Sequence, residues 1–250
     1  MSHPPRRLLI ILAKYPRAGQ VKTRLAVSIG VEAATSLYSA FLADLAPRFM
    51  HGNQRCGFDI CWVYTPDTPE FERMLANLCA LPQSSQITFV GHAASNLAEH
   101  QVKQLQWAAG AGYQQAVIIT TDTPHLSRTR VDDAFERLND HDVVIGPCVD
   151  GGYYLLGVCQ YWQVLDQVEM STGHVTNDVI RNAQAAWLSV SLLEPMLDID
   201  NEHDLNAFVS LMESSSGNLC PKTWSKLEEL GLRQRILKRG HDSMRSENGY

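Results

Sequence analysis

Continuous apolar runs alternate with segments of helical periodicity along the chain. Residues 8–13 (LLIILA), 58–64 (FDICWVY) and 116–120 (AVIIT) are almost entirely apolar, which is typical of strands covered on both faces. In residues 31–50, apolar side chains recur every four positions, which predicts a helix. The same criteria predict further helices over residues 69–79, 97–111, 127–138, 175–186 and 201–212, and further strands over residues 87–90, 143–145, 153–158 and 187–193. Repeated strand–helix units predict an α/β fold with a mainly parallel central sheet and helices on both faces.

A polar stretch divides the chain after its last predicted strand–helix unit. We expect a single α/β domain over residues 1–213, in which Ser127 and Asn201 act as helix N-caps and Asp204 stands in a first turn. Residues 214–250 are expected to hold a polar break, a helix over residues 224–237 and a flexible tail. A chain of 250 residues can bury a large core without disulfides or metal ions.

The composition is that of an ordinary folded protein and argues against several classes. Lys and Arg number 21 and Asp and Glu number 27, and the resulting net charge of −6 argues against a nucleic-acid partner. No apolar run is long enough for a signal peptide or a membrane span, so we expect a soluble, cytoplasmic protein. The six cysteines form no C-x-x-C pair, which predicts reduced thiols.

A basic segment follows the first predicted strand. Residues 14–24 carry four Lys or Arg side chains and no acid, at the strand end where open α/β sheets bind ligands. Backbone N–H groups, Lys and Arg suit phosphate oxygens. A phosphate-binding P-loop needs glycine directly before lysine, but Val21 precedes Lys22 and Gly19 stands alone, which disfavours both that loop and a dinucleotide fingerprint. The alternative is a solvated basic loop; its position favours phosphate binding.

Aspartates follow two later extended segments. Asp122 comes directly after the strand at residues 116–120 and can hold Mg²⁺ or Mn²⁺ bridging diphosphate oxygens; the alternative is an Asx turn before Pro124. Asp198 and Asp200 share a face if their segment is extended. One of them is expected to be structural, and Asp200, nearer the end of the segment, is favoured as the metal ligand.

A third candidate is the Asp150-Gly151-Gly152 sequence. Two adjacent glycines allow a positive φ and a close approach of backbone to ligand. Asp150 beside them can bind an acceptor hydroxyl or act as a base. The alternative is a tight hairpin turn, for which Asp-Gly is a common signal, although a turn can also carry a site.

Four motifs together resemble a known family. They are Ala-Lys-x-Pro-x-x-Gly-x-Val-Lys-Thr-Arg-Leu, Thr-Asp-x-Pro-x-Leu, Gly-Pro-x-x-Asp-Gly-Gly-Tyr-Tyr-Leu and Asp-x-Asp-x-x-x-Asp-Leu, beginning at residues 13, 121, 146 and 198. They resemble small bacterial GT-A-type nucleotide-diphospho-sugar transferases of the radical-SAM or selenodomain-associated type, whose biochemistry is largely undefined. Nucleotidyltransferases acting on phospholactate, molybdopterin and sugar phosphates are more distantly similar. The resemblance covers residues 7–210 and implies a Rossmann-like GT-A fold.

The resemblance also implies roles for individual residues. It implies nucleotide binding by Ala13, Lys14, Gly19, Lys22 and Arg24, acceptor binding by Asp150, Gly151 and Gly152, catalytic roles for Lys22, Arg24 and Asp150, and Mg²⁺ or Mn²⁺ binding by Asp122 and Asp200. The chain departs from the family at residues 96–100, where Asn-Leu-Ala-Glu-His replaces Asp-Leu-Gly-Glu-Arg, and at Thr121, where relatives often have Gly or Ser. These departures predict altered substrate choice or reduced activity.

These features together favour a metal-dependent enzyme that transfers a group from a nucleoside diphosphate sugar to a small acceptor. The alternative enzyme is a nucleotidylyltransferase that joins an NTP to a phosphorylated or carboxylated metabolite. A third hypothesis is a noncatalytic nucleotide-binding module, motivated by the altered residues 96–100 and by the helix beyond the domain.

Overall fold

The computed structural model describes residues 5–50, 57–79, 87–91, 97–215 and 217–238. Its strands are β1 (Arg7–Lys14), β2 (Asp59–Thr65), β3 (Ile87–Gly91), β4 (Gln115–Thr120), β5 (Val143–Pro147), β6 (Tyr153–Val158) and β7 (Val190–Leu192). Its helices are α1 (Thr23–Ile29), α2 (Val31–Met50), α3 (Pro69–Cys79), α4 (Leu97–Gly110), α5 (Arg128–Arg137), α6 (Val175–Ala185), α7 (Glu202–Glu213) and α8 (Pro221–Glu229). None of these helices is long and apolar enough to cross a membrane.

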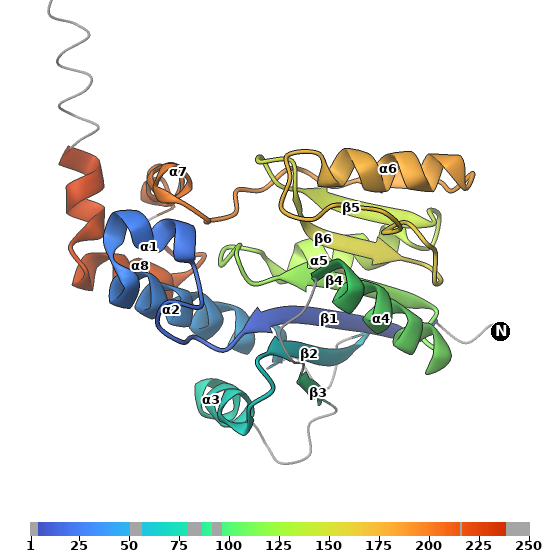
Figure 1. Ribbon diagram of the computed structural model, residues 1–250, viewed down its shortest axis with the longest axis horizontal. Coiled ribbons are helices and arrows are strands. Elements are labelled where there is room, and N and C mark those ends of the chain that lie inside the picture. Colours follow the sequence, from blue (N-terminus) through green and yellow to red (C-terminus); the bar gives the residue numbers. More distant parts are fainter. Residues whose placement is uncertain (1–4, 51–56, 80–86, 92–96, 216, 239–250) are drawn as a thin grey trace, which may run out of the picture.

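The strands form one seven-stranded sheet in the order β3-β2-β1-β4-β6-β5-β7 (Figure 1). Neighbouring strands are parallel except at β6, which is antiparallel to both β4 and β5. The predicted α/β fold with a mostly parallel sheet is therefore confirmed. The carboxyl end of β1 points toward α1 and α2 (Figure 1).

Alternation along β1 explains why its sequence is apolar throughout. Leu9 and Ile11 pack in one core cluster with side chains of α2, α3, α5, α7 and α8. Ile10 and Leu12 pack in a second cluster with side chains of α4 and α6. Because side chains of a strand point alternately to its two faces, helices on both faces require every position to be apolar.

Local signals define several helix starts. Ser127 accepts a hydrogen bond from the backbone N–H of Arg130 at the start of α5. Asn201 and Asp204 form a reciprocal capping box at the start of α7. Both predicted N-caps are therefore confirmed.

Two helical segments differ from the prediction. Helix α1 overlaps the end of the basic segment, where no helix is predicted; it is short, and no side chain caps its first turn, so the usual sequence signal is missing. The helix predicted over residues 224–237 begins earlier, at Pro221, and is interrupted at Gly231, where φ is +65°, before helix resumes over residues 232–238. The tail predicted from Gly240 lies outside the described residues.

Hydrogen bonds hold the start of α8 against α2. The Asp44 carboxylate of α2 accepts hydrogen bonds from the backbone N–H groups of Lys222 and Thr223, at 2.9 and 2.7 Å. This arrangement satisfies two donors in the first turn of α8. The cysteines of the described residues are free thiols, as predicted, and Cys56 lies outside those residues.

Candidate active site

The order of strands reverses between β1 and β4. The chain passes from β1 to β2 and β3 on one side and then places β4 on the other side of β1. In open α/β sheets, ligands bind at such a switch point, outside the carboxyl ends of the strands. A cleft of about 380 Å³ lies there. Its wall includes the predicted site residues Ala13, Lys14, Lys22, Arg24, Asp122, Asp150 and Asp200.

Lys22 brings two of the predicted aspartates together. It precedes α1 in a left-handed backbone conformation, with φ at 48°, and its side chain is 4% exposed. Its ammonium group forms ion pairs with Asp122 and with Asp200, at 2.7 Å from the latter. Burial lowers the pKa of the Lys22 amine, but the two carboxylates raise it by more, so the pKa lies above its usual value and the group stays charged.

Backbone contacts bring the segments of these two aspartates together. Asp122 follows β4, and its carbonyl accepts a hydrogen bond from the N–H of Ile199 at 3.0 Å. The N–H of Asp200 donates to the Asp204 carboxylate at 3.0 Å, so Asp204 serves the start of α7 as predicted. Burial raises the pKa of the Asp200 carboxyl, but the positive charges of Lys22, Arg24 and Lys14 together lower it by more, so its pKa lies below the usual value.

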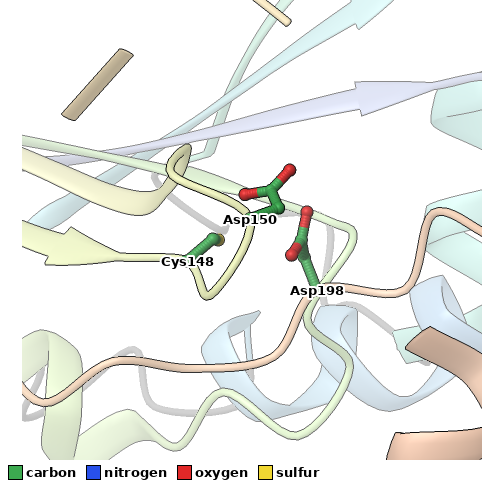
Figure 2. A group of neighbouring side chains, drawn as sticks. All are labelled: Cys148, Asp150 and Asp198. Carbon is green, nitrogen blue, oxygen red and sulfur yellow. The ribbon is translucent and has the colours of Figure 1, made fainter. Parts of the chain in front are cut away.

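Asp150 and Asp198 form a second pair of aspartates, next to Asp122 and Asp200. The ligand atoms of Cys148, Asp150 and Asp198 lie within 4.8 Å of one another, and the Asp198 side chain points toward Asp150 (Figure 2). Burial, followed by the charges of Asp150 and Asp200, raises the pKa of Asp198 to about 7. Burial and the charge of Asp198 also raise the pKa of the Cys148 thiol, so this sulfur stays protonated.

Asp150 is held by a tight turn between β5 and β6. Its carboxylate accepts a hydrogen bond from the N–H of Gly152 at 2.8 Å. Gly151 has φ at +93°, and a Cβ there would lie 2.1 Å from the carbonyl oxygen of Gly173. The hairpin-turn alternative is therefore right as local structure, and the same turn presents Asp150 to the cleft. Gly19, Gly151 and Gly152 do not themselves line the cleft wall.

Other cleft residues were not found from the sequence. Tyr38, Thr65, His100 and Ser171 also line the wall. Tyr38 lies at a buried position of α2 and has the pattern of a core residue. His100, which is 6% exposed, belongs to the stretch that departs from the family motif, and that departure was the available signal. Asn96, in the same stretch, lies outside the described residues.

Comparisons with known proteins show which folds the chain resembles. Residues 53–172 match the model of a family described as uncharacterised and conserved in bacteria (DUF2064). The whole structure is similar to that of a provisionally assigned nucleotide-diphospho-sugar transferase from Desulfovibrio desulfuricans G20, with 27% identity and a TM-score of 0.79 over 92% of this chain and 97% of the other. No protein of curated function matches the chain. The predicted resemblance to a GT-A-like transferase family of unknown function is confirmed.

Two further solved structures share the fold at low identity. One is a cytidylyltransferase from Leptospira borgpetersenii serovar Hardjo-bovis, with 11% identity and a TM-score of 0.51 over 96% of each chain. The other is the 4-diphosphocytidyl-2C-methyl-D-erythritol synthase of Anaerococcus prevotii, with 9% identity and a TM-score of 0.51 over 82% of this chain and 96% of the other. The fold is thus one that nucleotide-sugar transferases and cytidylyltransferases share.

Proposed function

We propose that this chain is a metal-dependent transferase that moves a group from a nucleoside diphosphate sugar to a small acceptor. One observation carries the proposal: the cleft at the switch point is lined by three basic side chains and by three aspartates. The basic side chains are Lys14, Lys22 and Arg24, and the aspartates are Asp122, Asp150 and Asp200. A metal–diphosphate group carries both signs of charge and needs both kinds of side chain.

The basic side chains would bind the diphosphate. Lys14 and Arg24 are exposed at the cleft and can contact phosphate oxygens directly. Lys22 is held among the aspartates, so its charge lies next to the expected cation. Ala13 and Gly19 are assigned to nucleotide binding by the family resemblance, and of the two Ala13 lines the cleft. Lys22 and Arg24 would offset the negative charge that develops on the leaving diphosphate.

The acidic residues fit a hard divalent cation. Mg²⁺ and Mn²⁺ prefer carboxylate oxygens and keep sites for phosphate and water. Asp150 and Asp198 offer two carboxylates within reach of one another, and burial, followed by the negative charge of Asp150 and Asp200, raises the pKa of Asp198. Asp122 and Asp200 remain predicted ligands at the same edge. The bound cation would supply positive charge to the leaving group.

Asp150 also faces the open side of the cleft. Its side chain is exposed, and its turn leaves room for an acceptor hydroxyl to approach. We therefore assign acceptor binding to the turn of Asp150, Gly151 and Gly152, with Asp150 as the residue that contacts the hydroxyl.

Thermal unfolding with a panel of nucleotides and nucleotide sugars, each with and without Mn²⁺, tests this function. Ligand at a hundred times its Kd stabilises the folded state by about 2.7 kcal/mol. We expect one nucleoside diphosphate or nucleotide sugar to stabilise the wild type with Mn²⁺, and Asp122→Ala to lose that effect. Asp140→Ala, an exposed position outside the cleft, is the matched control. The proposal fails if no member stabilises the wild type.

Product analysis separates this reaction from its alternatives. A sugar transferase releases a nucleoside diphosphate, whereas a nucleotidylyltransferase releases pyrophosphate from an NTP. The 27% identity to the Desulfovibrio protein favours the first, because likeness to the cytidylyltransferases concerns the fold alone. A noncatalytic module would bind nucleotide without turnover, and cation-dependent donor hydrolysis that Asp122→Ala abolishes would argue against it.

A further inference from the structure

A buried tyrosine reaches the switch point from a helix that carries no predicted site residue. Tyr38 of α2 is 3% exposed and lines the cleft. Its hydroxyl accepts a hydrogen bond from the backbone N–H of Lys14 at 2.9 Å and lies 2.8 Å from the hydroxyl of Thr121. Thr121 directly precedes Asp122. The tyrosine therefore contacts the start of the basic segment and the strand end that carries an aspartate.

Separation of two strands explains this contact. Pairing between β1 and β4 ends at Leu12 and Thr120. Beyond that point the N–H of Lys14 has no strand partner on the β4 side, and buried backbone donors need one. The hydroxyl of Thr121 donates to the carbonyl of Leu12 at 3.2 Å. Two side chains thus continue the bonding between the strands where the backbones diverge.

The directions of these hydrogen bonds form a single chain. Because Thr121 donates its proton to Leu12, the Tyr38 hydroxyl must donate to Thr121 while it accepts from Lys14. Each hydroxyl then acts once as donor and once as acceptor. Removing either hydroxyl leaves a buried polar group without its partner.

We propose that Tyr38 and Thr121 are positioning residues that set the spacing between the phosphate-binding segment and Asp122. This inference rests on the proposed function, in which the phosphate-binding segment binds the diphosphate and Asp122 lies at the cation. Fixed spacing makes the cation and the nucleotide bind better together than separately. Tyr38 and Thr121 therefore contribute to the coupling between the two ligands.

A packing role alone does not explain the pair. Phenylalanine fills nearly the volume of tyrosine, and a core position of α2 has no need of a hydroxyl. Burial, with a further effect of Asp122, raises the pKa of Tyr38 to about 12, so the hydroxyl keeps the proton that it donates.

Two readouts test the pair in the full chain. The first is the factor by which Mn²⁺ tightens binding of whichever of UDP, GDP, CDP and ADP binds the wild type best. The second is hydrogen exchange of the Lys14 amide, with the neighbouring Tyr15 amide, which donates to Thr65 on the other side of β1, as internal reference. The variants are Tyr38→Phe, Thr121→Val, Thr121→Ser and the double variant Tyr38→Phe with Thr121→Val.

We expect Tyr38→Phe and Thr121→Val each to reduce the coupling factor roughly threefold to tenfold, the effect of one hydrogen bond. Thr121→Ser keeps its hydroxyl and retains the factor. The double variant loses no more than the worse single one, because both changes break the same chain of bonds. Tyr38→Phe speeds exchange of the Lys14 amide and leaves that of Tyr15 unchanged.

Tyr154→Phe is the matched control, because Tyr154 is fully buried and its hydroxyl contacts Glu194 away from the cleft. It should retain the coupling factor even if it unfolds at a lower temperature. An unchanged factor in Tyr38→Phe and Thr121→Val, additive losses in the double variant, or unchanged Lys14 exchange overturns this inference alone. A wild type that binds none of the nucleotides with Mn²⁺ overturns the proposed function and the inference with it.

Discussion

Two pairs of aspartates, three of which line the cleft, have the same side chain and different surroundings. Asp122 and Asp200 share the Lys22 ammonium, which, with other nearby positive charges, keeps the pKa of Asp200 low despite burial. Asp150 and Asp198 lie side by side, and no Lys or Arg of the described residues forms an ion pair with either. Burial and this neighbour raise the pKa of Asp198 to about 7.

The difference separates two tasks that the sequence does not distinguish. One pair fixes a buried basic side chain, so its charge is already offset within the protein. The other retains negative charge that a divalent cation would offset. Under the proposed function, Asp150 and Asp198 should contribute most to cation affinity, and Asp122 and Asp200 should both contribute to it and control the position of Lys22.

The largest effect is expected from Asp198→Asn. This change removes one of the two neighbouring carboxylates, and Mn²⁺ affinity, with cation-dependent turnover, should fall by about a hundredfold or more. A titration of free Mn²⁺ followed by electron paramagnetic resonance measures the affinity. Asp140→Asn should leave it unchanged. Equal affinities in Asp198→Asn and the wild type would show that this pair does not hold the cation.

Lys22→Met should lower the stability of the protein through the other pair, Asp122 and Asp200. The change leaves Asp122 and Asp200 without their counter-ion, and loss of one partner of a buried ion pair costs about 3–5 kcal/mol. The carboxylates are 37% and 35% exposed, so water reduces this cost, and we expect about 1–3 kcal/mol. Urea unfolding at pH 8 measures it. Lys103→Met, at an exposed position on α4, is the control; a loss no greater than in the control would contradict the role of the ion pairs.

Without cation, the contribution of Asp198 to the free energy of unfolding should depend on pH. An unfolded Asp has a pKa of about 3.9, and burial raises that of folded Asp198 to about 7. Below pH 4 the carboxyl is protonated in both states, so Asp198→Asn changes little. Stability of the wild type is lost as pH rises from 4 to 7, because over that range the unfolded chain releases this proton and the folded protein retains it; above pH 7 both states are ionised and the loss is complete.

Asp198→Asn should therefore be more stable than the wild type at pH 8 without cation. A rigid site would give about 4 kcal/mol, and water in the open cleft reduces it to about 1–2 kcal/mol. Urea unfolding from pH 4 to pH 8 in chelator follows the difference. A variant less stable than the wild type at pH 8 would contradict the environment assigned to Asp198.

The smallest effect is expected from Cys148→Ala. A protonated thiol is a poor ligand for Mn²⁺, so the affinity should change by less than about threefold. Stability should fall by about 1 kcal/mol, because a small buried side chain is removed. Calorimetric titration with Mn²⁺ measures the first effect and thermal unfolding the second. A tenfold loss of affinity would place the sulfur among the ligands.

Much of the fold could be predicted because burial on two faces leaves a direct trace in the sequence. The predicted bounds of α2, α3 and β6 coincide with those of the structure. Helix α1 was missed because Lys22, where a capping side chain would stand, adopts a left-handed backbone and makes no capping hydrogen bond. The interruption at Gly231 was missed because residues on both sides of it have good helical periodicity.

The candidate site could be predicted only as a set of strand ends. That Asp122 and Asp200 lie at one cleft follows from topology, since both end extended segments at the same edge. The partner of each aspartate does not follow, because it depends on how far the Lys22 side chain reaches across the sheet. Tyr38 was missed for a similar reason: one hydroxyl distinguishes it from the core residues around it.

The reversed direction of β6 has a consequence for how specificity can change. It places the turn between β5 and β6 on the edge that holds the carboxyl ends of the parallel strands. A hairpin turn can accept insertions or exchange without shifting a helix, unlike a loop that joins a strand to a helix. Here Gly151 lies against Gly173, so the turn is not independent. Grafting a new acceptor preference onto this scaffold therefore requires residues 148–152 and 170–174 to be exchanged together, as one cassette.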